Sequence, residues 1–471
     1  MRVCLQRIAV MIGMLGLAAC KPGGDVLTDG AKCYPAQAVP WIEAGSAKAA
    51  GAATDPGGAY AIYLDGSASM VGYIRGGTKD TRPLADLIGM LPSLAGIDQS
   101  KIEIVRFDRK ISTMAPKDLS VMQSEAGYLC SAGNRNCDAQ ESHIDQALAK
   151  VAEADQQSLS IVVSDLWLAN SKVLTTDGVA LSKPLSDILA SGRSIAIYGF
   201  ESPYAGRVSD LPSGRNNVTA SRRYLFAVAI GPLRRLKALH NAMQNAPSST
   251  IAGDLKSGKA HYSLFTLEPA VASDPAKQAF ALPPKSPLKK TSFLPVRTGV
   301  RINQFQLSKK EALRLIGAVG ATWPGSQSVA VVPGAVWQGA STGQTDLFRM
   351  TGEDCAAKGG DWRREGELKG GWQGDTGDFK LDPGELASLP AGKYLLVGTL
   401  RRSSLLSPNP DTQWMRDWSF NAATEGQAVK LAVMPTLNLA EMARLLEVAL
   451  LKSAQEKPMN IGGFAVAVEI K

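Results

Sequence analysis

The sequence lacks several features that would point to common classes of function. It has no run of five or more basic residues, and its net charge of +8 is spread over short pairs such as Arg222-Arg223 and Arg401-Arg402. Scattered pairs of this kind are typical of a solvated surface, so we expect no nucleic-acid binding. The chain has only three histidines, and no G-x-S-x-G motif surrounds Ser67 or Ser69, which disfavours histidine-dependent catalysis at these serines. After the N-terminus, no stretch approaches the roughly 18 apolar residues of a membrane-spanning helix.

The N-terminus has the pattern of a secretory signal. Two arginines flank its start, residues 8–17 form a short apolar run, and Leu17-Ala18-Ala19-Cys20 follows. This ending resembles the bacterial lipoprotein box, which implies that residues 1–19 are removed and that Cys20 carries the lipid anchor. In such lipoproteins, Lys21 after the cysteine implies sorting to an outer membrane, with the protein facing the periplasm. The alternative is a plain signal peptide in which Cys20 is incidental.

Four cysteines remain after the signal and the anchor, namely Cys33, Cys130, Cys137 and Cys355. Four cysteines permit three pairings, and the sequence alone does not choose among them. The closeness of Cys130 and Cys137 favours a disulfide bond between these two. Zinc is the competing use, but the spacing differs from that of a C-x-x-C zinc knuckle.

Residues 20–59 form a predicted tether, because residues 43–59 are small and polar without apolar periodicity. From Tyr60 the pattern changes to a buried strand over residues 60–64. Leu84, Leu87, Ile88 and Leu91 then follow at the spacing of an amphipathic helix. Strands and helices alternate in this way to about residue 245. Such alternation predicts an α/β domain over residues 60–245, with a mostly parallel sheet covered by helices on both faces.

The remainder of the chain has a different pattern. Residues 246–296 are predicted to be an irregular linker, since they contain the helix-breaking and strand-breaking run Leu282-Pro-Pro-Lys-Ser-Pro287. Residues 297–471 are predicted to form a β-rich domain of unknown role. Its candidate strands cover residues 328–332, 379–381, 393–400, 418–420 and 464–470. One late amphipathic helix begins at Leu439, with Asn438 and Glu441 as an expected capping pair.

Polar side chains follow two of the predicted strands and precede one helix. The segment Asp65-Gly66-Ser67-Ala68-Ser69 comes directly after the strand over residues 60–64. Asp165 stands in the same relation to the strand over residues 159–163, and Ser142 precedes the helix over residues 144–151. Ligands gather at the carboxyl ends of strands in open parallel sheets, so we expect these three segments to meet at one edge.

These residues resemble three motifs of the von Willebrand factor A (vWA) family. Asp65-x-Ser67-x-Ser69 matches D-x-S-x-S, Ser142-His143-Ile144-x-x-Ala147-Leu148 resembles T-N-I-x-x-A-L, and Ser164-Asp165 resembles the family's T-D strand end. The resemblance covers residues 60–245 and implies a Rossmann-like fold with a metal-ion-dependent adhesion site. It nominates Asp65, Ser67, Ser69, Ser142 and Asp165 as ligands of the metal ion or of its waters. Two departures are Ser142 in place of threonine, which keeps the hydroxyl, and Leu166 in place of the usual glycine.

The chemistry of these five side chains agrees with that implication. Three hydroxyls and two carboxylates are hard oxygen donors that suit Mg²⁺, with Mn²⁺ or Ca²⁺ as substitutes. A shell of this kind leaves the ion under-coordinated, so an acidic side chain of a protein partner can complete it. The sequence therefore predicts an envelope lipoprotein, bound to the membrane by its anchor, that binds a protein and catalyses no reaction.

Other interpretations of the same residues remain open. Asp65-Gly66 can be a simple turn, and Ser142 and Asp165 can be helix caps. A vWA domain with a degenerate, metal-free site would have a structural role in the envelope. A serine hydrolase would use Ser67 or Ser69 as nucleophile, His143 as base and Asp165 to orient the histidine, although no nucleophile elbow surrounds either serine.

Overall fold

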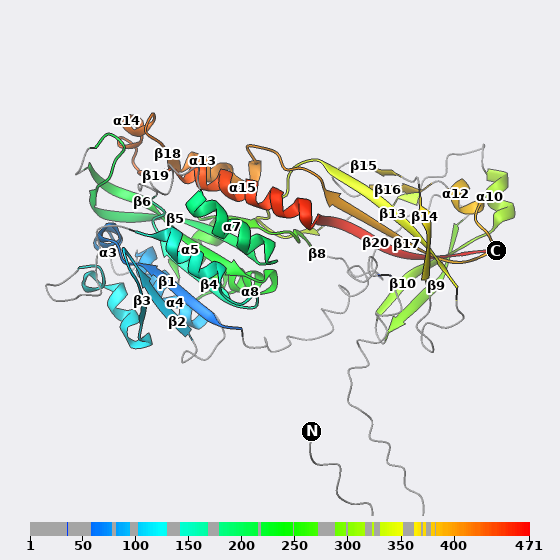
Figure 1. Cartoon of the computed structure of the whole chain (residues 1–471), viewed down its shortest axis with the longest axis horizontal. Helices are drawn as coiled ribbons and strands as arrows, with labels where there is room; N and C mark the ends of the chain where they lie inside the picture. Colours follow the sequence, from blue (N-terminus) through cyan, green and yellow to red (C-terminus); the bar gives the residue numbers. More distant parts are fainter. Residues whose placement is uncertain are drawn as a thin grey trace, which may run out of the picture.

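The computed structural model describes only part of the chain in detail. It covers residues 35, 58–77, 82–94, 102–129, 142–167, 179–214, 218–247, 249–271, 288–297, 300–315, 323–324, 330–351, 362–368, 371–373, 378–381 and 383–471. The signal segment, Cys20, Cys130 and Cys137 lie outside the described residues, so the anchor and the disulfide remain sequence predictions. Within the described ranges, two large mixed sheets and their covering helices make up a mixed α/β protein (Figure 1).

The first sheet has seven strands. Their order is β3 (Ile111–Met114), β2 (Ile102–Phe107), β1 (Tyr60–Asp65), β4 (Leu159–Ser164), β6 (Val218–Gly231), β5 (Ser194–Val208) and β7 (His261–Phe265). Strand β1 pairs in parallel with β2 and β4. The pairs β2–β3, β4–β6, β5–β6 and β5–β7 are antiparallel. The sheet is therefore mixed, and the expectation of a mostly parallel sheet is wrong.

The cause of this difference is the long hairpin formed by β5 and β6. The two strands have 15 and 14 residues, and β6 returns antiparallel to β5 and inserts between β5 and β4. Continuous apolar runs indicate burial on both faces of a sheet but carry no information about strand direction. Periodicity alone therefore could not distinguish a returning strand from a further parallel one.

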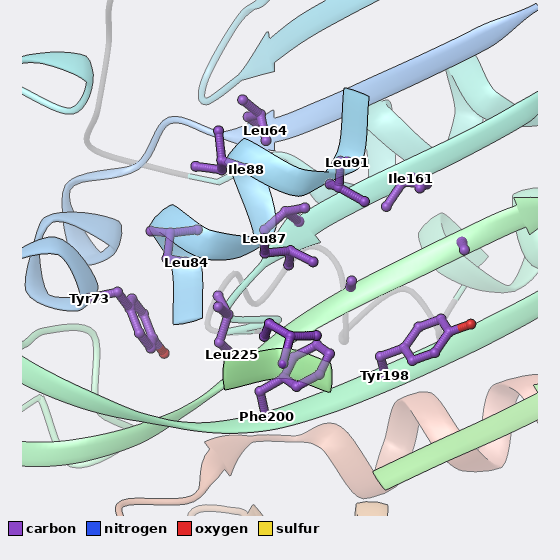
Figure 2. Close-up of a cluster of buried hydrophobic side chains, with 14 of the residues drawn as sticks. Leu64, Tyr73, Leu84, Leu87, Ile88, Leu91, Ile161, Tyr198, Phe200 and Leu225 are labelled. Carbon is purple, nitrogen blue, oxygen red and sulfur yellow. The ribbon is translucent and has the colours of Figure 1, made fainter. Parts of the chain in front are cut away.

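Helices cover both faces of the first sheet. One face carries α4 (Pro83–Leu94), α8 (Leu233–Gln244) and α9 (Thr250–Ser257), and the other carries α5 (Ile144–Ala152), α7 (Val179–Ala190) and α15 (Leu439–Glu456). Leu84, Leu87, Ile88 and Leu91 of α4 are fully buried, which confirms the predicted amphipathic spacing. Figure 2 shows these four side chains beside Leu64 of β1 and Ile161 of β4. The packing of these side chains holds β1 and β4 in position, and both strands end at the candidate site.

The predicted linker over residues 246–296 contains regular structure. It includes α9, the short strand β8 (Ala270–Val271) and β7, which extends the edge of the first sheet, and β9 (Leu288–Arg297) begins within it. The proline-rich run over residues 282–287 lies outside the described residues. The expectation of an irregular linker over residues 246–296 is wrong, because a proline-rich run does not exclude helices and strands in the residues before and after it.

The second sheet has six strands. Their order is β14 (Trp362–Glu367), β13 (Ser341–Met350), β17 (Gly392–Arg402), β20 (Met459–Ile470), β10 (Val300–Leu307) and β9. Only β10 and β20 pair in parallel among these neighbours. A third core, which includes Phe305, Tyr394 and Phe464, packs on this sheet. The expected strands over residues 393–400 and 464–470 lie within β17 and β20, so both are confirmed.

Smaller elements surround the two sheets. Beside the second sheet lie β15 (Gly371–Gln373), β16 (Asp378–Leu381), α10 (Lys309–Leu315) and α12 (Pro383–Ala387) (Figure 1). The strand β11 (Trp323–Pro324) pairs with β16. The strand β12 (Ala330–Val331) pairs with β8. Between β17 and α15 the chain forms η7 (Pro410–Thr412), α13 (Gln413–Asp417), β18 (Ser419–Phe420), α14 (Glu425–Ala428) and β19 (Thr436–Leu437). The 3₁₀ turns η2 (Ala68–Met70), η4 (Pro116–Gln123) and η5 (Glu125–Gly127) and the helix α3 (Val71–Arg75) follow the first strands.

Helix α15 connects the two sheets. It packs against α7 on the first sheet and runs directly into β20 of the second (Figure 1). Its predicted start at Leu439 is confirmed, but Asn438 adopts a left-handed backbone conformation and its side chain does not cap the helix. The segment between β17 and β20 is therefore part of the packing around the first sheet, although it is remote from that sheet in sequence.

Candidate functional site

The candidate site lies at the carboxyl ends of β1 and β4. These strands are parallel neighbours, with Leu64 opposite Val163, so Asp65 lies beside Ser164 and Asp165 is the next residue after Ser164. Both aspartates are only 1% exposed. Ser142, just before α5, reaches the same edge through its side chain. The structure thus brings together the three segments that the sequence places at strand and helix ends.

Asp65 is the centre of a set of short hydrogen bonds. Its Oδ2 accepts from the hydroxyl of Ser142 at 2.8 Å and from that of Ser164 at 2.7 Å. Its Oδ1 accepts from the backbone N–H of Ser67 at 2.9 Å. The hydroxyl oxygens of Ser67 and Ser69 lie 3.1 Å apart. Four of the five predicted ligands therefore form one connected cluster, and Ser142 binds Asp65 instead of capping α5.

The fifth residue, Asp165, influences Asp65 through its charge. Burial, followed by the negative charge of Asp165, raises the pKa of Asp65 to about 6, and hydrogen bonds from Ser164 and Ser67 offset part of the shift. The negative charge of Asp165 thus disfavours the ionised form of Asp65. Asp65 is therefore a carboxylate whose ionised form is disfavoured in the folded protein.

Asp165 itself faces a buried arginine. Its Oδ1 accepts from the backbone N–H of Trp167 at 3.2 Å, and its Oδ2 lies 3.2 Å from Nη1 of Arg223. Arg223 comes from β6 and is 1% exposed. The centre of its guanidinium lies 4.6 Å from the ring centroid of Trp167 and 5.0 Å from that of Tyr204. Arg223 is thus a fixed positive charge beside one of the two carboxylates.

Sequence reasoning missed Arg223, because the pair Arg222-Arg223 was expected to be solvated surface. The Arg222 side chain is 53% exposed and pairs with Glu201, as expected of a surface residue, whereas Arg223 points into the protein. Alternation along a strand could have indicated that two adjacent arginines face opposite sides. The position of Arg223 beside Asp165 could not have been found, because it depends on the insertion of β6 next to β4.

A second buried arginine holds the loops around Asp65 in place. Arg106 of β2 donates to the backbone oxygens of Gly66 and Gly127, and its Nε donates to Asp108 at 3.0 Å. The backbone oxygen of Asp108 accepts from the N–H of His143. A Cβ at Gly66 would overlap the Arg106 guanidinium, so a larger residue there would displace this hydrogen-bonded group. Asp108 lies at the end of a buried strand, as Asp65 and Asp165 do, so the same sequence pattern could have identified it.

The C-terminal part of the chain forms a wall beside the site. The ring centroid of Phe420 lies 5.5 Å from that of Trp167, and the backbone N–H of Met434 donates to the oxygen of Arg222 at 2.9 Å. Glu425, which is 2% exposed, accepts from the backbone N–H and the hydroxyl of Ser213 near the tip of the β5–β6 hairpin. These contacts hold the hairpin that carries Arg223.

The histidine of the alternative hydrolase hypothesis lies near the site but contacts its own helix. Nδ1 of His143 is 3.3 Å from Nε2 of Gln146 and 3.8 Å from Oδ1 of Asp145. Asp165, the residue proposed to orient this histidine, faces Arg223 instead. This geometry gives no support to a Ser-His-Asp arrangement.

Comparisons with known proteins add no identification: no protein-family model, curated protein or solved structure matches the chain. In the part of the chain that the structure describes, no helix is long and apolar enough to cross a membrane. Within the same ranges, no three His, Cys, Asp or Glu side chains are grouped as metal ligands. The candidate set has two carboxylates, and its other donors are serine hydroxyls.

Proposed function

We propose that this chain binds a protein partner through one divalent cation held by Asp65, Ser67, Ser69, Ser142 and Asp165. The observation that carries the proposal is the meeting of Asp65 with the Ser142 hydroxyl at 2.8 Å and with the charge of Asp165, from three separate segments. The vWA resemblance of the same segments supports it. The proposed role is adhesion at the cell envelope, without catalysis.

The donors fit a hard cation. Serine hydroxyls and carboxylates are the ligands that Mg²⁺ prefers, and Mn²⁺ and Ca²⁺ accept the same atoms. Burial and the charge of Asp165 raise the pKa of Asp65, and a divalent cation would offset both effects by favouring the ionised carboxylate. Serine oxygens that now donate hydrogen bonds retain lone pairs with which to coordinate a metal. A side-chain carboxylate of the partner would supply a further oxygen ligand to such an ion.

The candidate site lies at one end of the first sheet. The carboxyl ends of β1 and β4, near α3, lie at the end of the first sheet that points away from the six-stranded sheet (Figure 1). The proposed lipid anchor at Cys20 would hold the chain at the outer membrane, facing the periplasm. Replacement of Cys20 by serine should release the protein from the membrane fraction, whereas a mutant that stays there would contradict the anchor.

A second candidate function follows from Arg223. The ion pair between Arg223 and Asp165 already places a positive charge where a metal-binding site would need its carboxylate free. This observation favours a degenerate, metal-free vWA-like domain with a structural role in the envelope. The two candidates differ in one measurable property, which is whether the folded chain binds a divalent cation.

Equilibrium dialysis with Mn²⁺ separates the two candidates. We expect one Mn²⁺ per native chain and none for the Asp65→Asn variant, which keeps the side-chain shape and removes the charge. Asp187→Asn is the matched control, since Asp187 is an exposed aspartate of α7 that pairs with Lys183. Native protein that binds no Mn²⁺ would reject the adhesion site and favour the structural role.

A further inference from the structure

We infer that Arg223 sets the charge of the candidate site, so that the cation-loaded site carries one net positive charge and selects a single carboxylate as its ligand. This inference rests on the proposed function and specifies the chemistry of the partner group. It assigns Arg223 a role in specificity without making it a ligand of the ion.

Arg223 is held in place by an ion pair and by aromatic rings. Its Nη1 lies 3.2 Å from Oδ2 of Asp165, and the side chain is almost completely buried. The rings of Tyr73, Trp167 and Tyr204 surround it, with centroids 4.6 to 5.8 Å from the guanidinium carbon. Ring faces attract a cation, and a guanidinium stays charged at every pH that a protein tolerates. The positive charge is therefore permanent and fixed in position.

The charge of Arg223 acts unequally on the two aspartates. Its Nη1 lies 3.2 Å from Asp165, whereas Asp65 has hydroxyl and backbone N–H partners. Two ionised carboxylates and one guanidinium leave the cluster with a single net negative charge. A divalent cation reverses this to a single positive charge, and one carboxylate from a partner then makes the assembly neutral. Charge in a buried site must be balanced closely, because desolvated charges are costly.

The inference predicts effects of opposite sign on two ligands. Without Arg223, the cluster would be more negative and would bind a cation more tightly, because a neighbouring positive charge no longer opposes it. The loaded site would then be neutral, so it would attract a carboxylate less strongly. A residue that only stabilises the fold would weaken both binding steps or neither.

The test uses the purified chain with Mn²⁺ and acetate as probes. Mn²⁺ affinity is measured by titration, and acetate binding to the Mn²⁺-loaded protein is measured by paramagnetic relaxation of ¹³C-labelled acetate. For Arg223→Gln we expect Mn²⁺ to bind about tenfold more tightly and acetate about tenfold more weakly. Arg222→Gln is the matched control, because it removes an exposed arginine that pairs with Glu201, and it should stay within about threefold of native protein for both ligands.

A second variant keeps the test decisive if Arg223→Gln does not fold. Asp165→Asn removes the opposite charge, so the loaded site should bind acetate more tightly than native protein while its affinity for Mn²⁺ falls. The inference is overturned if acetate binds equally to native protein and to whichever of these two variants folds. Native protein that binds no Mn²⁺ at all rejects the proposed function itself, so the two failures are distinguishable.

Discussion

The two aspartates at the ends of β1 and β4 have the same burial but different partners. Asp65 accepts hydrogen bonds from serine hydroxyls and a backbone N–H, whereas Asp165 faces the guanidinium of Arg223 at 3.2 Å. Neutral donors stabilise a carboxylate without changing the charge of the site, and an arginine cancels one charge. The charge of Asp165 is therefore compensated by Arg223, whereas the charge of Asp65 is uncompensated because its hydrogen-bond donors are neutral. A bound cation should stabilise the ionised form of Asp65 more than that of Asp165.

The largest effect on stability should come from replacing Arg223, the partner of Asp165. Arg223→Met leaves Asp165 buried beside apolar groups, so we expect unfolding free energy to fall by about 3 to 5 kcal/mol. Urea unfolding in the presence of chelator measures this change. Arg222→Ala is the control, because its exposed ion pair with Glu201 should contribute less than about 1 kcal/mol. Equal losses in the two variants would show that the Arg223–Asp165 pair contributes no more to stability than the exposed Arg222–Glu201 pair.

A smaller effect on stability should come from the titration of Asp65. The pKa of Asp65 is raised to about 6 in the folded protein, so its favourable contribution is complete below about pH 4 and is lost as the pH rises through 6. By this linkage, metal-free protein should lose about 2 kcal/mol from this group between pH 4 and pH 7. Asp65→Asn should remove that loss. Unfolding measured at both pH values checks it, and a pH dependence unchanged by the substitution would contradict it.

The smallest effects should come from the hydroxyls around Asp65. Ser142→Ala removes a 2.8 Å hydrogen bond to a buried carboxylate, so we expect a loss of about 1.5 kcal/mol in metal-free protein. Ser69→Ala is the control, since the Ser69 hydroxyl contacts the hydroxyl of Ser67 and not the carboxylate, and should cost less than about 0.5 kcal/mol. Thermal melting of both variants ranks them. A larger loss for Ser69→Ala would reverse the expected order.

Much of the arrangement around Asp65 was predictable, because it follows from local rules. The apolar run over residues 60–64 and the helical spacing of the α4 leucines indicate a strand and a covering helix. Polar residues after buried strands then fall at one edge, as Asp65 and Asp165 do. The same rule applied to Asp108 would have found the partner of Arg106.

Arg223 and the C-terminal wall were not predictable from the same rules. The direction of β6 and its place beside β4 depend on pairing between distant segments, which periodicity does not encode. The amphipathic pattern of α15 indicates a buried face but does not identify α7 as its neighbour. Packing across long sequence separations therefore supplies the residues that set the charge of the site.

The central claim is that this cluster binds a divalent cation when the protein is folded. Thermal melting of the native chain with increasing Mg²⁺ tests it most directly, because an ion that binds only the folded state stabilises it by mass action. At about 100 times the dissociation constant the gain should reach about 2.7 kcal/mol, and it should vanish with chelator and in Asp65→Asn. Melting of native protein that is indifferent to Mg²⁺, Mn²⁺ and chelator would contradict the account.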